Sequence, residues 1–372
     1  MSTEPRLDID ASLASALGGR PLDLGDMDSV RLILAGNSVI DWNRAHFQTL
    51  GDVDRFLAMH LLDLEDPEDN RRLRFVHAEA VNYLEEHLGL TFPQDLREPE
   101  DIREVFRHAS KTGGFRRRQI LACVILKLMH VINHMEAAEL RFQTPLGQAD
   151  VLDLAERRIV ESADRMRAEG FPLVAFYGSR KTRNSVITKL IAKKENTAAT
   201  IFDKLRFRLV TEEQRHVLPA IAWLTRNLFP FNYVIPGQSH NNLVDLGELL
   251  RAAPYAAMAQ GLQLPGPDLP GRDNYPNPAE NPFSGPGYRM VNFIVDFPVR
   301  VDHLVNIRYG AMLGRTVFAM VEFQVLDRET ARCNEEGENA HRLYKERQRA
   351  IVEQRLKKGA RWRRKRRGGD GK

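Results

Sequence analysis

Apolar and polar positions follow one pattern up to about residue 150 and another pattern beyond it. From Val30 to Arg141 the pattern is typical of helices, and Pro67, Pro93 and Pro99 separate them. Beyond residue 150, short apolar runs alternate with charged helical segments, which is typical of strands packed against helices. The pattern predicts an α+β chain, in which a mixed β-sheet flanked by helices follows an all-helical N-terminal domain.

The same pattern divides the chain into four parts. We expect a loosely ordered polar arm over residues 1–30, a helical domain over 31–150, an α+β domain over 151–350 and a basic tail over 351–372. The elements expected around the α+β domain are, in order, helix 148–170, strand 172–177, helix 184–194, strand 200–210, helix 212–227, strand or loop 229–235, loop 253–287, strand 288–301 and a strand beginning at Thr316.

The strand beginning at Thr316 is apolar at both sets of alternating positions, which predicts a strand covered on both faces in the middle of a sheet. Glu322 and Gln324 are two residues apart, so their side chains leave the same face of this strand. Burying a carboxylate is unfavourable unless a partner pairs or coordinates it. Glu322 is therefore a candidate for a phosphate-and-metal site. The alternative is an ordinary strand with Glu322 exposed at an edge.

A basic turn from Gly178 to Arg183 precedes a predicted helix. Within that helix, Ser185 and Lys189 are four residues apart and lie one above the other. Together with Lys181 and the unpaired N–H groups of a helix start, they would attract a polyphosphate. The alternative is a basic helix end in contact with solvent only.

Asp203 is the one carboxylate at the start of the apolar strand expected over residues 200–210, and Arg208 follows five residues later. A regular strand would place two side chains five residues apart on opposite faces. Asp203 therefore either precedes the strand or follows a bulge within it. A simple capping role is the alternative for this carboxylate.

Histidines and cysteines give weaker signals. His130 and His134 are four apart and could bind a metal with a third ligand, but Val131 follows His130, so no HExxH pattern is present and we expect packed histidines. Cys123 and Cys333 are the two cysteines of the chain, which gives no disulfide framework and indicates a reducing, cytoplasmic setting.

The charge is unevenly distributed along the chain. Lys and Arg number 54 and Asp and Glu 50, for a net charge of +4, and a basic run from Arg361 to Arg367 surrounds Trp362. Clustered arginines beside a tryptophan favour contact with RNA or the ribosome, and a solvated tail is the alternative. The longest apolar run, Ile120 to Leu126, is too short to span a bilayer, so no membrane partner is expected.

Several of these residues occur in the order of a known family. One set is the Glu-x-Gln strand with the Gly, Ala-His and Tyr-Lys that follow it, and the other is the set of lysines, Asp, Arg and Gly-Tyr upstream. Together they resemble the RelA/SpoT alarmone synthetase domain of the nucleotidyltransferase superfamily over roughly Val151 to Gln348. The matching positions are Lys181, Ser185, Lys189, Asp203, Arg208, Gly287, Tyr288, Glu322, Gln324, Gly337, Ala340, His341, Tyr344 and Lys345.

The resemblance implies a pyrophosphokinase that transfers the β,γ-pyrophosphate of ATP to the 3′-hydroxyl of a guanosine or adenosine nucleotide. It implies magnesium held by Asp203 and Glu322, with Arg208 neutralising the transferring phosphate. It also implies sets of ATP-binding and acceptor-binding residues. The ATP-binding set is Lys181, Ser185 and Lys189, with Arg180, or alternatively Arg183, in place of a family arginine where this chain has Ser179. The acceptor-binding set is Tyr288, Gln324, His341 and Lys345.

The chain also departs from the family. Arg289, Met290, Val291 and Asn292 follow Tyr288 where the family has Gln-Ser-Leu-His, and no His-Asp dipeptide of the family's hydrolase domain is present. Three interpretations stay open at this stage. They are a nucleotide pyrophosphokinase, a tRNA 3′-end pyrophosphokinase, and a non-catalytic nucleotide- or RNA-binding module on the same fold.

Overall fold

In a computed structural model of the chain, the structure describes residues 17, 22–35, 42, 46–110, 116–192, 205–245, 287–304, 313–336 and 341–357. The helices of eight residues or more are α2 (Leu24–Ala35), α3 (Leu50–Met59), α4 (Pro67–Leu88), α6 (Arg103–Ser110), α7 (Arg116–Gln143), α8 (Gln148–Ala168), α9 (Arg183–Ala192), α10 (Val217–Asn227), α14 (Arg328–Glu335) and α15 (His341–Lys357), with shorter helices α5 (Gln94–Arg97), η3 (Gln214–His216), η4 (Phe231–Tyr233) and η5 (Asp302–Leu304).

The described strands form one mixed sheet in the order β1-β2-β5-β4-β3. Their bounds are β1 (Leu173–Arg180), β2 (Leu205–Thr211), β3 (His240–Asn241), β4 (Val291–Arg300) and β5 (Thr316–Asp327). The central strand β5 runs parallel to β2 and antiparallel to β4. The α+β class predicted from the sequence is thereby confirmed, and the strand at Thr316 lies in the middle of the sheet as expected.

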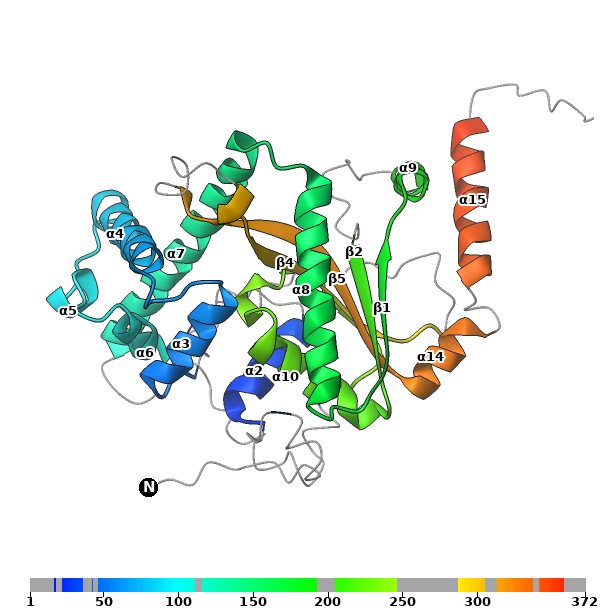
Figure 1. Ribbon diagram of the computed structural model, residues 1–372, viewed down its shortest axis with the longest axis horizontal. Helices are drawn as coiled ribbons and strands as arrows, with labels where there is room; N and C mark the ends of the chain where they lie inside the picture. The colour runs from blue at the N-terminus through cyan, green and yellow to red at the C-terminus, as the bar shows by residue number, and fades with distance from the viewer. Residues whose placement is uncertain are drawn as a thin grey trace, which may run out of the picture.

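One face of the sheet is apolar and covered by helices. Phe207, Phe293 and Phe323 are fully buried there, and the rings of adjacent strands stack with centroids 6.1 and 5.7 Å apart. Helix α8 crosses this sheet and α10 lies beside it (Figure 1). Because side chains alternate along a strand, the neighbouring positions point to the opposite face, where the polar residues of β2, β4 and β5 gather.

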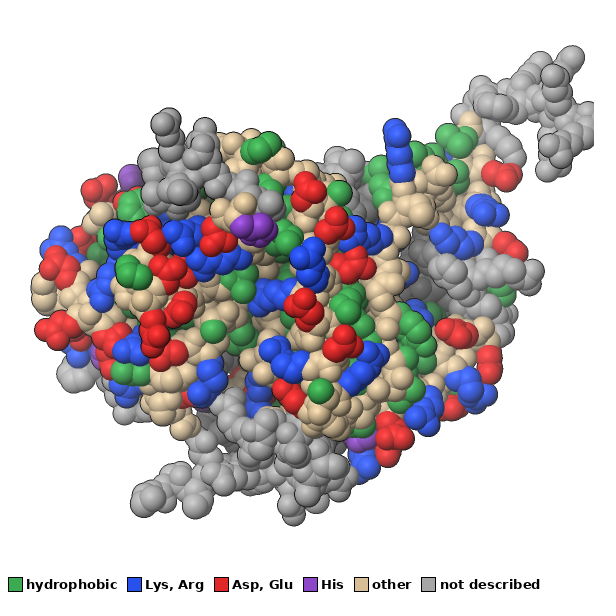
Figure 2. All heavy atoms as spheres, in the orientation of Figure 1, with side chains coloured by type: hydrophobic (Ala, Val, Ile, Leu, Met, Phe, Trp, Pro, Cys, Tyr) green, Lys and Arg blue, Asp and Glu red, His purple; other side chains and the backbone are tan. Residues whose placement is uncertain are grey.

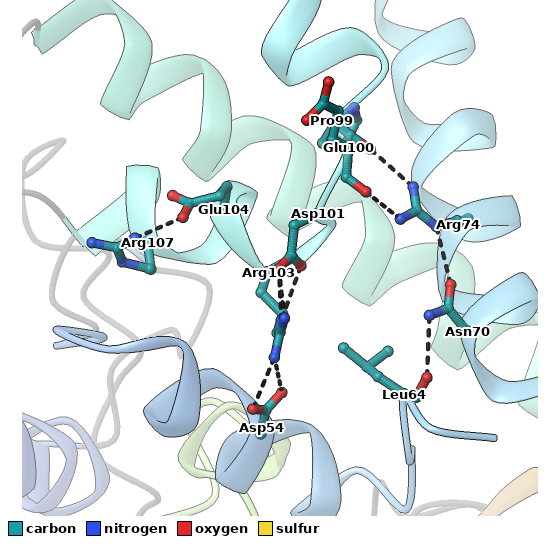
Figure 3. Close-up of polar contacts among 10 residues, drawn as sticks. All are labelled: Asp54, Leu64, Asn70, Arg74, Pro99, Glu100, Asp101, Arg103, Glu104 and Arg107. Carbon is teal, nitrogen blue, oxygen red and sulfur yellow. Dashed lines mark hydrogen bonds and ion pairs between the residues drawn. The ribbon is translucent and has the colours of Figure 1, made fainter. Parts of the chain in front are cut away.

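The N-terminal helices α3, α4, α6 and α7 enclose a second apolar core of their own. Polar contacts fasten its connecting segments (Figure 3). The Arg103 guanidinium bonds both Asp101 and, 3.1 Å away, the Asp54 carboxylate of α3. The Arg74 guanidinium donates to the carbonyl oxygens of Pro99 and Glu100, at 2.9 and 2.6 Å. These bonds fix α4 and α6 around the apolar contacts that hold the body together.

The predicted loose arm over residues 1–30 is wrong for its last part. Helix α2 begins at Leu24, and Met27 and Val30 are buried in the core of the sheet domain. An ion pair fastens this helix: the Arg226 guanidinium of α10 contacts the Asp26 carboxylate, with Nε and Oδ1 2.6 Å apart. Sequence patterning missed α2 because its buried residues pack against strands and helices some 200 positions away.

The buried Asp26–Arg226 pair gives a stability prediction. Arg226→Met should lower the free energy of unfolding by about 3–5 kcal/mol, because it leaves a carboxylate that is 6% exposed without its cation. Urea unfolding checks this value. Adding Asp26→Leu should recover most of the loss, because the remaining charge is then removed as well. A double variant as unstable as the single one would show that the pair is not the cause.

Helix α7 is unusual in length and composition. Within the described residues, its segment Arg117–Gln143 is long and apolar enough to cross a membrane by those two criteria alone, with 39% of the most apolar window buried. In the structure this helix packs on α4, α6 and β5. The expected short apolar run, Ile120 to Leu126, therefore lies inside a longer apolar helix of the N-terminal core.

The two bodies meet along a seam where α3 and α7 face η4 and β5. Burial lowers the pKa of His60 and of His134 to about 4, so both imidazoles are neutral at pH 7. His134 stacks on Phe318 and lies 3.5 Å from Asp296, whose pKa burial raises to about 6. The expected packed histidines are therefore found at the interdomain contact.

The lowered pKa of His60 predicts how stability depends on pH. Its contribution is complete above the unfolded value of about 6.5 and is lost as the pH falls towards about 4, because the unfolded state binds the proton first. Urea unfolding between those pH values gives the slope of the free energy of unfolding against pH. His60→Gln should reduce this slope by an amount that corresponds to nearly one proton. His87→Gln, an exposed change, is the control. Equal slopes for His60→Gln and the wild type would contradict the prediction.

Candidate active site

The polar face of the sheet brings together side chains from three adjacent strands. Strand register places Arg206 opposite Glu322, and Arg208 opposite Gln324, on β2 and β5. On the other side of β5, Asn292 of β4 lies opposite Gln324. Glu322 and Gln324 are 5% and 3% exposed, so the carboxylate is buried in the centre of the sheet and not exposed at an edge. The edge-exposed alternative for Glu322 is excluded.

One oxygen of Glu322 is fully engaged. Its Oε1 accepts hydrogen bonds from Asn292 Nδ2 at 3.0 Å and from Gln324 Nε2 at 2.9 Å. Gln324 Oε1 in turn accepts from Arg208 Nε at 3.1 Å, and Arg208 Nη2 donates to the Tyr288 hydroxyl at 2.9 Å. The five side chains form one continuous network, which fixes the rotamer of each member.

The other oxygen of Glu322 is buried without a hydrogen-bond partner among the described residues, and so is Asn292 Oδ1. A buried acceptor without a partner costs about 1–3 kcal/mol, more for a charged group. Two such acceptors on side chains already joined to each other are typical of a site that is completed by a cation or a ligand hydroxyl. This is the clearest chemical signal on the sheet face.

The backbone around Tyr288 is held from both sides. Asn242 Nδ2 donates to the Tyr288 carbonyl at 2.7 Å, while Asn242 Oδ1 accepts from Met290 N at 2.8 Å. The buried Asn334 of α14 makes the same two-way contact with the backbone of Arg289, at 3.0 and 2.7 Å. These four bonds fix the place of the aromatic ring, which is half-buried at the start of β4.

Lys181 follows the last residue of β1 and lies at the same site. Burial, together with the positive charges of Lys189 and Arg206, lowers the pKa of its ammonium to about 7, whereas the Glu322 carboxylate acts to raise it. Lys189, Arg206 and Glu322 therefore each lie within electrostatic reach of Lys181. A concentration of cations around a partly desolvated lysine is what a polyphosphate would neutralise.

Helix α9 presents its first turn at this end of the sheet. Thr182 Oγ1 accepts a hydrogen bond from Ser185 N at 3.3 Å and lies 3.1 Å from Ser185 Oγ. The Thr182 side chain thereby caps the start of the helix. Arg180 points elsewhere: its guanidinium contacts Asp153, 2.6 Å away, and Glu156 on α8. The structure thus brings Lys181 and Lys189 to the Glu322 network and ties Arg180 to α8.

Other predicted site residues fall outside this geometry. Asp203, residues 253–286 of the expected loop and the basic tail Arg361 to Arg367 lie outside the described residues, as do the side chains of His341 and Tyr344. Lys345 lies near the start of α15, which packs on α9, where Arg355 donates to the Ile191 carbonyl at 2.7 Å. The acceptor roles of His341 and Lys345 stay predictions.

Within the described ranges, no three His, Cys, Asp or Glu side chains lie close enough together to hold a metal ion. Glu322 is one carboxylate of the expected pair, and Asp203, the other, precedes the described start of β2 by two residues. The hard oxygens that Glu322 and Asn292 leave without partners are of the type that magnesium accepts. The donor chemistry of the site thus fits a magnesium ion.

Sequence reasoning missed two members of the site, Arg206 and Asn292. Arg206 is two residues before Arg208, so it shares the face of Arg208 once the strand is known to begin near Leu205. Asn292 was noted as a departure from the family, but no sequence signal connects it with Glu322. That contact depends on the antiparallel pairing of β4 with β5.

Charged side chains elsewhere on the molecule are mixed. Over the face that carries α4 and α8, acidic and basic side chains are interspersed (Figure 2). This agrees with a net charge of +4. On that face no large region of one sign competes with the lysines of the sheet site for an anionic ligand.

Solved structures that match this chain include alarmone synthetases and a member of the GTP pyrophosphokinase family, the group that the sequence motifs resemble. No protein-family model and no curated protein matches the sequence. Small alarmone synthetase 1 from Bacillus subtilis, bound to its product pppGpp, is 11% identical, with 59% of this chain and 93% of that chain covered and a TM-score of 0.30.

Two further structures give similar values. A GTP pyrophosphokinase family protein from Streptococcus pneumoniae is 12% identical, with coverages of 55% of this chain and 86% of that chain and a TM-score of 0.29. Small alarmone synthetase 2 from Bacillus subtilis is 14% identical, with coverages of 60% and 95% and a TM-score of 0.26. At TM-scores of this size the likeness carries no inference about activity, which has to come from this chain's own side chains.

Proposed function

We propose that the chain is an ATP-dependent pyrophosphokinase that transfers the β,γ-pyrophosphate of ATP to the 3′-hydroxyl of a guanosine or adenosine nucleotide. The observation that carries the proposal is the buried Glu322 carboxylate, which has one oxygen without a hydrogen-bond partner among the described residues, lies within electrostatic reach of Lys181 and pairs in register with Arg206. A carboxylate set among cations suits a reaction in which a hydroxyl attacks a phosphate.

In the proposed reaction a bond forms between the ribose 3′ oxygen and the β-phosphorus. The bond from the β-phosphorus to the oxygen shared with the α-phosphate breaks, and that oxygen leaves with AMP. Glu322, or a neighbouring group, helps to take the proton of the attacking hydroxyl, while Asn292 and Gln324 hold the Glu322 carboxylate through Oε1. Lys181 and Lys189 bind the triphosphate, and Arg208 neutralises the transferring group.

The acceptor base is assigned to the Tyr288 ring. Base stacking on an aromatic side chain contributes about 1–3 kcal/mol and suits any nucleobase. The hydrogen bond from Arg208 to the Tyr288 hydroxyl joins this platform to Gln324 and so to Glu322. The base and the attacking hydroxyl would therefore be positioned by one connected set of side chains.

Magnesium is part of the proposal. Asp203 and Glu322 are the carboxylates that would hold the ion, which when bound neutralises charge on the triphosphate. As a test of metal binding apart from activity, the protein can be titrated with Mn²⁺ by electron paramagnetic resonance. Asp203→Asn should weaken binding of the ion without changing the melting temperature. Unchanged Mn²⁺ affinity would remove Asp203 from the site.

The experiment that tests the function uses the full chain with magnesium, ATP labelled in the γ-phosphate, and GDP, GTP, ATP or tRNA as acceptor. We expect label in a nucleotide 3′-pyrophosphate and one AMP formed for each product. Label in tRNA would show that the acceptor is the 3′ end of an RNA and not a free nucleotide. ATP binding without any transfer would overturn the proposed enzyme and leave a nucleotide-binding protein.

A further inference from the structure

A cavity with one apolar and one polar wall lies at the seam between the helical body and the sheet domain, away from the Glu322 network. Its volume is about 80 Å³, and its apolar wall is formed by residues that include Trp42, Phe56, Val76 and Met129. Its polar wall comes from both bodies: His60, His130, Asn133, Asn232 and Tyr233. An apolar cavity with a few convergent polar groups is the usual form of a small-molecule site.

The polar wall is organised by Asn232. Its amide nitrogen lies 3.2 Å from His60 Nε2 and 3.2 Å from His130 Nδ1. His60 Nδ1 lies 2.9 Å from the Phe56 carbonyl, so this nitrogen carries the proton and Nε2 accepts. Because His130 Nδ1 also accepts from the same amide, the proton of His130 is on Nε2.

Neutral imidazoles are required for this arrangement. Burial, together with the neighbouring histidines of the seam, lowers the pKa of His60 to about 4 and that of His130 well below its ordinary value. Both rings nevertheless keep part of their surface accessible to water, because they line the cavity. The wall therefore presents dipoles and no net charge to whatever enters.

Asn232 leaves one group unsatisfied. The side chain is 3% exposed, and its Oδ1 is buried without a hydrogen-bond partner among the described residues. An amide acceptor in this position costs about 1–3 kcal/mol if nothing donates to it. Asn232 is one of the residues that line the cavity, next to a histidine whose Nε2 carries a proton.

We propose that this cavity binds a small uncharged planar molecule with an amide-like edge. The N–H of the ligand donates to Asn232 Oδ1, and its carbonyl accepts from His130 Nε2. Charged ligands are disfavoured, because the two arginines of the lining are already paired, Arg72 with Glu136 and Arg315 with Asp66. Since one water needs about 10–15 Å³ of such volume, the cavity has room for about one six-membered ring.

The test uses the full chain and 2-pyridone, which has this edge on one ring. Calorimetric titration should show saturable binding at least about tenfold tighter than for 1-methyl-2-pyridone, which lacks the N–H donor. Crystals soaked in 2-pyridone should show the ring beside Asn232. Equal affinities for the two compounds, no saturable binding, or ordered water alone in the soaked cavity would each overturn the proposal.

Substitution provides a matched pair of variants. Val76→Phe should fill the cavity from the wall of α4 and weaken 2-pyridone binding about tenfold or more, because Val76 is 5% exposed and lines it. Val160→Phe makes the same change on the exposed side of α8, where the valine is 40% exposed, and should leave binding unchanged. Circular dichroism checks that both variants fold. Undiminished binding by folded Val76→Phe would place the ligand elsewhere.

Discussion

Glu322→Gln is expected to reduce pyrophosphate transfer by about 1,000-fold or more while the melting temperature changes little. The amide has the shape of the carboxylate, so the bonds at Oε1 can be kept. The amide nitrogen that replaces Glu322 Oε2 can no longer take a proton or carry negative charge. In the wild type that oxygen is buried without a partner among the described residues, so nothing in the fold depends on it.

The matched control is Glu161→Gln, the same change at an exposed position of α8. It should transfer pyrophosphate at the wild-type rate. Initial rates with saturating ATP and acceptor give kcat, and thermal melting shows that each variant is folded. If Glu322→Gln retained more than about a tenth of the wild-type kcat, the carboxylate would have no part in the chemical step.

Lys181→Met is expected to weaken ATP binding about 100-fold near pH 6 and much less near pH 8.5. The pKa of Lys181 without ligand is about 7, because burial and two neighbouring cations disfavour its charge. Below that pH the wild-type lysine is already protonated. Above it, ATP binding must take up a proton, so the affinity of the wild type falls by up to about tenfold per pH unit. The variant has no such proton to gain.

Calorimetric binding of a non-hydrolysable ATP analogue across this pH range distinguishes the outcomes. Lys181→Arg should keep high affinity and lose the pH dependence, because its guanidinium stays protonated. Arg157→Met, which removes an exposed cation of α8, is the control for general charge effects and should follow the wild-type curve. A wild-type affinity that did not change with pH would show that Lys181 does not contact the phosphates.

The sequence predicted the parts of the site that depend on local spacing. Glu322 and Gln324 share a face because they are two apart on one strand, and the run around them is apolar enough to require a central strand. Lys181 and Lys189 were found because basic residues at a helix start form a pattern that can be read along the chain.

The parts that sequence could not predict depend on pairing between distant segments. Asn292 meets Glu322 only because β4 runs antiparallel to β5 in one particular register. Arg206 joins the site because β2 is parallel to β5. The ion pair of Asp26 with Arg226 and the seam between His60 and Asn232 likewise join residues about 200 and 172 positions apart. No periodicity within one segment carries such information.

The contact of α7 with β5 limits how this protein can be divided. His134 of α7 stacks on Phe318 of β5, and Arg141 donates to the Phe318 carbonyl at 3.3 Å. Four residues further along the same strand is Glu322. A fragment beginning at residue 151 would lose α2 and α7 together and uncover the first half of the central strand. The helical portion is therefore part of the folding unit of the sheet domain, and the two cannot be exchanged as independent modules.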